Sequence, residues 1–542
     1  MSSKKGAIIL YDTTLRDGTQ QEGISLTVKD KLDITKKLDE IGIDIIEGGF
    51  PYSNPKDEEY FQKVSQLDLK HSRIAAFGST RKAGITAAKD PNIQALIKSK
   101  AKIVTIVGKT WDLHVLEVLE TSLDENIEMI KDSISYLKSQ SLEVHFDAEH
   151  FFDGFEANKK YALESIKAAA AAGADAVHLC DTNGGVLPNR LSIIIDEVKE
   201  IIPTPLGIHV HNDGELAVAN SITAVEKGVH YVQGTVNGYG ERCGNANLCS
   251  IIPTLQIKMG LKVVELEQMQ KLSTIAKEIS ELVNMGINPS QPYVGTRAFA
   301  HKGGLHASAV AKVERSYEHM DPKIIGNDRK IVVSELAGRS NILSAAEKMG
   351  VKITKDESAK ILESVKTAEL EGFQYEGADA SLEMLLRRNL GNYEPPFVLE
   401  DFMVLAEKLR RLPVSNDGTK DDDLLSEAMV KVRIGDVVYH TAAEGNGPVN
   451  ALDEALRKAL RDHFPNVDEI RLTDYKVRIL NEEGATGAAV RVLIESTDGK
   501  DSWSTVGSST NIIYASWLAL IDSIEYWMLK SNPGIPTSLN DK

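Results

Sequence analysis

The strongest constraint on the fold of this chain is a regular alternation of short β-rich segments and helix-length amphipathic segments from residue 7 to about residue 285. Eight β-rich segments occur, at residues 7–12, 44–50, 73–78, 102–108, 142–150, 175–182, 205–213 and 231–238. Eight strand–helix units in roughly 280 residues match a TIM (β/α)8 barrel in number and size. A doubly wound open sheet would need a glycine-rich phosphate turn after its first strand, where TTLRDGTQQEG stands instead. The pattern therefore predicts an α/β fold with a TIM barrel over residues 1–285.

The alternation stops after residue 285, and a chain of 542 residues is longer than one hydrophobic core usually supports. Residues 286–424 begin with a polar, glycine-containing stretch and continue with short helical patterns, which predict a helical linker region. A charged, turn-rich stretch at 415–423 predicts the next boundary. Residues 425–535 then alternate strands and helices in two similar halves, which predicts a C-terminal α+β domain with a weak sign of internal duplication.

The charge and the cysteine content exclude several kinds of partner and location. The formal charge is 62 − 79 = −17, which argues against nucleic acid and anionic membrane surfaces as partners. Three cysteines without a C-x-x-C pair form no disulfide framework, as expected in a reducing cytoplasm. The N-terminus has too short an apolar run for a signal peptide, and no run of about 18 apolar residues occurs. We therefore expect a soluble cytoplasmic protein.

Unusual polar residues stand where the predicted strands end, which is where the active sites of TIM barrels lie. His209 and His211 are two residues apart in a strand and therefore point to the same face. Asp17 follows the first strand. A carboxylate and two imidazoles suit Mn²⁺, Fe²⁺ or Zn²⁺ and, less well, Mg²⁺. An isolated H-x-H pair is more often structural or merely exposed, but its place at a strand end favours a divalent metal site.

The loop NGYGERCGNANL, at residues 237–248, superficially resembles a dinucleotide-binding turn. It lacks the G-x-G-x-x-G spacing and follows the last strand rather than the first, so we reject that interpretation. Asn245 in this loop could instead face the metal.

Two further charged residues stand near the ends of the first two strands. Arg16 precedes the predicted ligand Asp17, and a guanidinium there could stabilise an enolate or hold a carboxylate. Glu47 ends the second strand and could pair with Arg16 and orient it. As a lone acid at a strand end, Glu47 would be unremarkable.

Other candidates depend more on context. Glu149 ends the fifth strand, and Thr182 ends the sixth, where its hydroxyl suits recognition of a small carboxylate or, alternatively, a helix N-cap. His301, His306 and Tyr317 lie beyond the barrel and qualify as acid–base groups only if their segment folds over a barrel mouth.

These motifs resemble the DRE-TIM metallolyase superfamily, and within it the family of 2-isopropylmalate, homocitrate and citramalate synthases. The resemblance runs almost end to end, from DTTLRDG through HVHND and GYGERCGN to a C-terminal regulatory domain. The stretches FDAEHFFDGF, AFAHKGGLHASAV and EGADASLEMLLRR are similar to the citramalate synthase branch. Isopropylmalate synthases typically carry an H-Q-D-G run where this chain has HASA.

The resemblance implies condensation of acetyl-CoA with pyruvate, then thioester hydrolysis to citramalate and free CoA. It implies that Asp17, His209 and His211 bind the metal ion (Mn²⁺, Mg²⁺ or Zn²⁺), with Asn245 close by. The metal would chelate pyruvate and polarise its carbonyl.

The resemblance also implies roles around the substrate. Arg16 would stabilise the developing alkoxide with Glu47 orienting it, and Thr182 would hold the carboxylate of the keto acid. Glu149 would lie near the acetyl methyl group. Some citramalate synthases have a tyrosine that contacts the keto acid two residues before that glutamate, and this chain has Asp147 there.

Regulation and assembly follow from the same resemblance. His306 and Tyr317 match a catalytic pair that reaches into the barrel of a partner subunit, which implies a homodimer. The C-terminal domain resembles one that senses a branched-chain amino acid, here isoleucine as feedback inhibitor of isoleucine synthesis. The alternatives are a 2-isopropylmalate synthase acting on 2-oxoisovalerate, a hydroxymethylglutaryl-CoA-type lyase and a non-catalytic sensor. A lyase would end soon after the barrel, and a sensor would not keep every catalytic residue.

Overall fold

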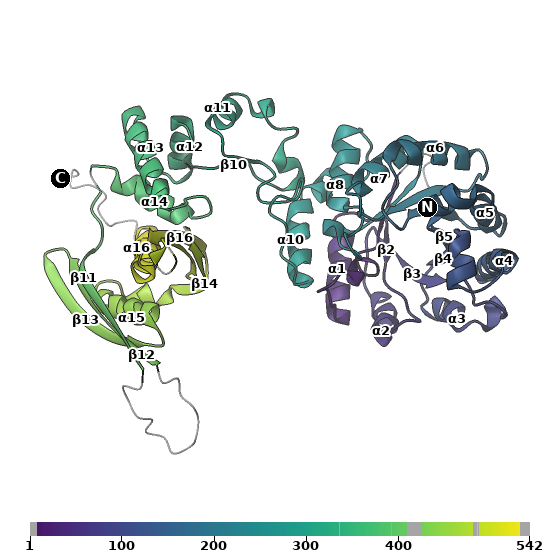
Figure 1. Ribbon diagram of the computed structural model, residues 1–542, viewed down its shortest axis with the longest axis horizontal. Coiled ribbons are helices and arrows are strands. Elements are labelled where there is room, and N and C mark those ends of the chain that lie inside the picture. The colour runs from purple at the N-terminus through teal and green to yellow at the C-terminus, as the bar shows by residue number, and fades with distance from the viewer. Residues whose placement is uncertain are drawn as a thin grey trace, which may run out of the picture. The chain divides into compact units, whose positions relative to one another are not determined.

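A computed structural model of the protein describes residues 8–531 except 335, 392, 409–423, 481–484 and 486 (Figure 1). These residues form two compact units. The first comprises residues up to 299 together with 320–329, and the second comprises 300–319 and the chain from 330 onward. The boundary expected at 415–423 lies outside the described residues.

The first unit contains a closed barrel of eight strands, in which each strand pairs in parallel with the next and β8 pairs with β1. This confirms the TIM barrel predicted from the sequence. The strands are β1 (Ile9–Asp12), β2 (Ile45–Glu47), β3 (Arg73–Ser79), β4 (Ile103–Lys109), β5 (Glu143–Glu149), β6 (Ala176–Asp181), β7 (Leu206–Val210) and β8 (Tyr231–Gly234).

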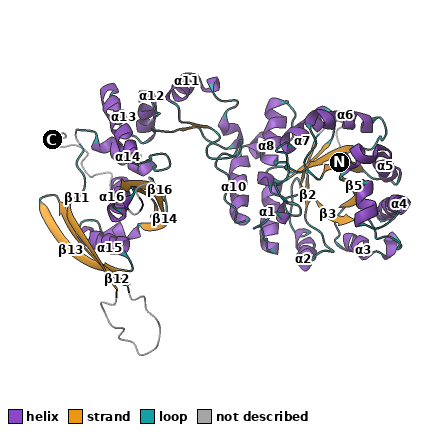
Figure 2. Cartoon of the chain, in the orientation of Figure 1, coloured by secondary structure: helices purple, strands orange, loops and turns teal. Residues whose placement is uncertain are grey.

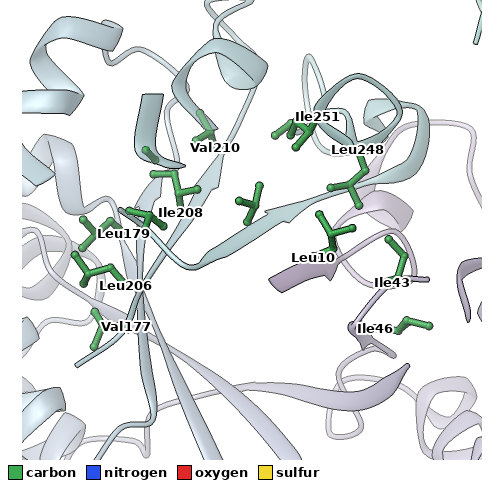
Figure 3. Close-up of a cluster of buried hydrophobic side chains, with 14 of the residues drawn as sticks. Leu10, Ile43, Ile46, Val177, Leu179, Leu206, Ile208, Val210, Leu248 and Ile251 are labelled. Carbon is green, nitrogen blue, oxygen red and sulfur yellow. The ribbon is translucent and has the colours of Figure 1, made fainter. Parts of the chain in front are cut away.

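Helices surround the barrel (Figure 2) and cover the outward side chains of the strands. Val177 of β6 and Leu206 of β7, for example, are paired neighbours in the core between sheet and helices (Figure 3). The helices are α1 (Val28–Glu40), α2 (Pro55–Val64), α3 (Pro91–Lys98), α4 (Leu123–Ser139), α5 (Phe151–Ala171), α6 (Pro188–Lys199), α7 (Ala217–Glu226), α8 (Leu248–Pro253), α9 (Leu266–Met269) and α10 (Leu272–Leu282).

The interior of the barrel is unusually polar along β5. Val144, Phe146 and Ala148 belong to the outer core, so the alternate residues of the strand face inward. The inward residues are Glu143, His145, Asp147 and Glu149. Strand β5 thus carries a row of ionisable side chains along the barrel axis and ends in the acids that the sequence singled out.

A glycine in β7 makes room for one buried histidine of this interior. A Cβ at Gly207 would lie 1.9 Å from Nδ1 of His178, so no larger residue fits opposite that ring. Nε2 of His178 is 3.0 Å from Nδ1 of His145, and both imidazoles contact the ring of Tyr11. The barrel below the active-site end is therefore filled by hydrogen-bonded rings as well as by aliphatic side chains.

The second unit begins with short elements and helices and ends in a repeated α+β arrangement. Sheet β11–β12–β13 is antiparallel and packs on α15, and sheet β14–β15–β16 is antiparallel and packs on α16. The elements are β9 (Ala300–His301), α11 (Gly304–Lys312), β10 (Lys330–Ile331), α12 (Arg339–Lys348), α13 (Lys355–Leu370), α14 (Asp379–Arg388), β11 (Val398–Lys408), β12 (Leu424–Ile434), β13 (Val437–Gly445), α15 (Pro448–Leu460), β14 (Arg471–Ile479), β15 (Val490–Thr497), β16 (Ser502–Ser509) and α16 (Ile512–Ser531).

By length and composition alone, α16 is the one described helix that could cross a membrane. A buried core helix meets the same two criteria, and α16 packs against β15, β16 and α14. It carries Asp522 and Glu525, both of which form ion pairs with Arg388 of α14. The apolar side chains of α16 are therefore explained by its packing within the second unit.

Candidate active site

Three potential metal ligands meet at the carboxyl ends of β1 and β7. Oδ2 of Asp17 lies 3.2 Å from Nε2 of His209 and 3.5 Å from Nε2 of His211, and the two Nε2 atoms are 3.1 Å apart. All three side chains are buried. A carboxylate oxygen and two imidazole nitrogens within 4.8 Å of one another form the one such cluster found among the described residues.

The loop after β8 supplies a fourth potential ligand atom, the amide oxygen of Asn245. Asn245 donates its amide to Oδ2 of Asp17 at 2.7 Å, while its own Oδ1 is buried and has no partner in the part of the chain described. A Cβ at Gly240 would lie 2.0 Å from that Oδ1, so the glycine keeps this space open. An orphaned amide oxygen beside an acid and two imidazoles fits a divalent cation or its bound water.

Electrostatics keep Asp17 ionised, as a metal ligand must be. Burial alone would raise the pKa of its carboxyl, but the Arg16 charge and hydrogen bonds from the two histidines hold that pKa well below its usual value. Burial lowers the pKa of His211. For His209, burial acts in the same direction, but its bond to Asp17 outweighs it and raises the pKa.

Arg16 is held over the barrel mouth by contacts on two sides. Its Nε donates to Oε1 of Glu47 at 2.6 Å, and its guanidinium stacks on the Phe77 ring at 3.9 Å. The other Glu47 oxygen accepts from the hydroxyl of Tyr11 at 2.7 Å. Nη1 of Arg16 reaches Asp17 at 3.4 Å, so the structure brings together the arginine, its expected partner and the cluster.

Thr182 lies just past the end of β6, and its hydroxyl oxygen already accepts one hydrogen bond. Its Oγ1 accepts the backbone N–H of His150 at 2.9 Å, which leaves its own proton free to donate to a carboxylate. Arg242 donates to the carbonyl of Thr182 at 2.7 Å and is paired with Asp213. Arg242 was not among the residues predicted from the sequence, although it stands inside the GYGERCGN motif.

The two acids at the end of β5 have different environments. Glu149 forms an ion pair with Lys109 at the end of β4, a residue that the sequence analysis missed. Asp147 is buried and accepts from Nε2 of Gln233 at 3.1 Å. Burial, reinforced by the nearby charge of Glu47, raises the pKa of Asp147 to about 7.

The candidates beyond the barrel belong to the second unit. His306 lies on α11, and its ring stacks on that of Tyr317, with centroids 4.2 Å apart. His301 is instead paired with Glu318 at 3.1 Å. The structure thus brings together the histidine and tyrosine of the expected pair and gives His301 a separate partner.

Comparison with known proteins covers nearly the whole chain. The HMGL-like family model matches residues 7–278, a homocitrate synthase post-HMGL domain-like model 293–372, and a LeuA allosteric (dimerisation) domain 376–528. An (R)-citramalate synthase of Aquifex aeolicus is 50% identical over 527 residues, 96% of this chain and 98% of the relative. One of Geobacter sulfurreducens is 52% identical, again covering 96% and 98%. A 2-isopropylmalate synthase of Methanocaldococcus jannaschii is 31% identical, covering 96% and 95%.

The closed barrel, the cluster at its carboxyl end and the HMGL-like match define a TIM-barrel enzyme of the HMGL-like class. The full-length matches are more specific. The chain belongs to the (R)-citramalate synthase family, whose reaction is an acyl-transferring condensation. The isopropylmalate synthase alternative is the more distant match.

Proposed function

We propose that the protein condenses acetyl-CoA with pyruvate and hydrolyses the resulting thioester, giving (R)-citramalate, free CoA and a proton. The observation that carries this proposal is the pairing of Arg16 with Glu47 beside the Asp17–His209–His211 cluster. That site lies in a chain that matches an (R)-citramalate synthase over 96% of its length. The product would serve isoleucine synthesis.

Asp17, His209 and His211 would hold a divalent cation, with Asn245 Oδ1 offering a further ligand or a bond to bound water. Such an ion, whether Mn²⁺, Mg²⁺ or Zn²⁺, supplies Lewis-acid polarisation of the keto acid when bound.

Arg16 would stabilise negative charge as it develops on the keto oxygen of pyruvate. Glu47 fixes the guanidinium through Nε, and its outer nitrogen Nη1 lies 3.4 Å from Asp17 of the cluster. The free hydroxyl proton of Thr182 would donate to the carboxylate of pyruvate. Asp147 and Glu149 would line the remaining side of the substrate site, where their separation by one residue on β5 directs both inward.

The methyl group of acetyl-CoA must lose a proton, and His306 with the stacked Tyr317 is our candidate for this acid–base chemistry. We propose that this pair acts in the barrel of the other subunit of a homodimer. The match to a LeuA allosteric (dimerisation) domain supports an effector site in the C-terminal domain, for which we propose isoleucine.

The test is a free-CoA release assay with acetyl-CoA and Mn²⁺, run separately with pyruvate, 2-oxobutyrate, 2-oxoisovalerate and 2-oxoglutarate. We expect strong preference for pyruvate, loss of activity with EDTA, and inhibition by isoleucine but not by leucine. Preference for 2-oxoisovalerate would assign the protein to the 2-isopropylmalate synthases instead. Absence of CoA release with all four keto acids would overturn the condensation itself.

A further inference from the structure

Gln233 is a buried amide inside the barrel that belongs to none of the motifs recognised in the sequence. It lies on β8 and is completely shielded from solvent. Its Oε1 is 2.7 Å from Nδ1 of His209, and its Nε2 is 3.1 Å from Oδ1 of Asp147. One side chain therefore joins the proposed metal ligand on β7 to the inward acid on β5.

The chemistry of these groups determines which atoms carry protons. A carboxylate oxygen accepts, so the NH₂ end of Gln233 faces Asp147, and its oxygen faces His209. Protonation of one Asp147 oxygen preserves this arrangement, because the other oxygen still accepts. An amide oxygen cannot donate, so Nδ1 of His209 must carry the proton.

The protonated Nδ1 decides what the opposite edge of the ring can do. In a neutral imidazole with a proton on Nδ1, Nε2 presents a lone pair. That Nε2 is the atom directed at Asp17, at 3.2 Å, and at His211. The bond to Gln233 thus keeps a proton on Nδ1, so a cation displaces only the Nε2 proton that His209 otherwise donates to Asp17.

We propose that Gln233 is a positioning residue that holds His209 in the Nδ1–H tautomer for metal binding through Nε2, with Asp147 fixing the orientation of the Gln233 amide. The inference rests on the metal site of the proposed function. It predicts that the acceptor oxygen at position 233, rather than the amide as such, sustains metal affinity. Loss of an outer partner of this kind typically costs 10–100-fold in metal affinity.

The experiment measures binding of Mn²⁺ to the chelator-stripped full-length protein by calorimetry, with no substrate present. Gln233→Leu removes the acceptor at nearly constant volume, whereas Gln233→Glu retains an acceptor for the Nδ1 proton. Asn92→Leu is the matched control, because Asn92 is a buried amide on α3 that donates to the Ser79 carbonyl at 2.6 Å. We expect a Kd raised about 10–100-fold in Gln233→Leu and within about threefold of the parent in the other two.

Three results would overturn the inference. Gln233→Leu could bind Mn²⁺ as tightly as the parent, Gln233→Glu could bind as weakly as Gln233→Leu, or Asn92→Leu could lose affinity to the same extent. Failure of the parent itself to bind one Mn²⁺ per chain would instead overturn the metal site of the proposed function. The two failures are therefore separated within one series of titrations.

Discussion

Arg16 and Glu47 form a 2.6 Å ion pair in which the carboxylate is completely buried. The pair is asymmetric, because Glu47 takes only Nε of the guanidinium through one oxygen and the Tyr11 hydroxyl through the other. A buried charge of this kind is costly unless it is paired and hydrogen-bonded. The arrangement therefore holds the guanidinium in one direction before any substrate arrives.

The first prediction concerns the charge of Glu47. Glu47→Gln preserves the shape but removes the charge that holds Arg16, so the guanidinium is free to turn toward Asp17, already 3.4 Å away. We expect kcat for CoA release to fall about 100-fold with little change in the KM for acetyl-CoA. Steady-state kinetics with pyruvate measure both constants.

A suitable control is Asp39→Asn, which alters another buried acid that accepts the backbone N–H groups of residues 70–72 and lies outside the cluster. It should lower stability while kcat stays within twofold of the parent. If Glu47→Gln loses less than tenfold in kcat, or if Asp39→Asn loses as much, the positioning role of Glu47 is wrong.

The second prediction concerns Tyr11, whose hydroxyl lies 2.7 Å from both Glu47 and Thr105. Tyr11→Phe leaves two buried oxygens short of a partner, so we expect a loss of about 1–3 kcal/mol in the free energy of unfolding of the barrel. Thr105→Val should lower the free energy of unfolding less in the Tyr11→Phe variant than in the parent. The reason is that the Thr105 hydroxyl has already lost its bond to Tyr11 in that variant. Thermal melts of the four proteins give this coupling, and strictly additive shifts would contradict it.

Much of this site could be predicted from short-range pattern. His209 and His211 share a face because strand side chains alternate, and Asp17 follows the strand that begins the barrel. Gln233 was missed because its importance depends on register, not on a motif. It is paired with Tyr11, more than 220 positions away, and only closure of the barrel brings β8 beside β1. A polar residue at an inward position of a buried strand was the one available signal.

His306 and Tyr317 illustrate a different limit. They stand 11 residues apart, His306 on α11 and Tyr317 beyond the end of that helix, so no helical spacing predicts that their rings stack. The residues made each a candidate acid–base group, and the family resemblance joined them as a pair. The structure adds the contact between the two rings.

The third prediction tests whether this pair acts across a dimer. Asp17→Asn removes a proposed metal ligand and His306→Ala the proposed base, so each variant alone should be nearly inactive. Dimers purified through two different tags, one on each variant, contain one doubly defective site and one intact site if the pair acts in the partner's barrel. Such dimers should regain about half the parent activity. Doubly tagged His306→Ala homodimers serve as the control, and no recovery in the mixed dimers would show that the pair does not act across subunits.

The last prediction concerns the buried charge cluster between α14 and α16. Asp522 accepts from the Ser381 hydroxyl at 2.5 Å and pairs with Arg388 at 2.7 Å. Burial nevertheless dominates and raises the pKa of Asp522 from 3.8 to about 6. An acid whose pKa is higher in the folded state binds its proton more tightly there, so its ionisation destabilises the fold. The contribution of Asp522 to the free energy of unfolding is most favourable below pH 4. It falls as the pH rises to about 6 and stays constant above that.

Asp522→Asn removes this titration while it keeps the shape. The stability of α16 in the variant, relative to the parent, should therefore increase by up to about 3 kcal/mol between pH 4 and pH 7. Hydrogen exchange of peptides from α16, corrected for the intrinsic pH dependence, measures this local free energy without requiring the whole chain to unfold in one step. Asp462→Asn, at an exposed position, is the control, and its difference from the parent in α16 should not vary with pH. A difference for Asp522→Asn that is flat, or that shrinks toward pH 7, would mean that Arg388 and Ser381 outweigh burial and keep this carboxyl ionised.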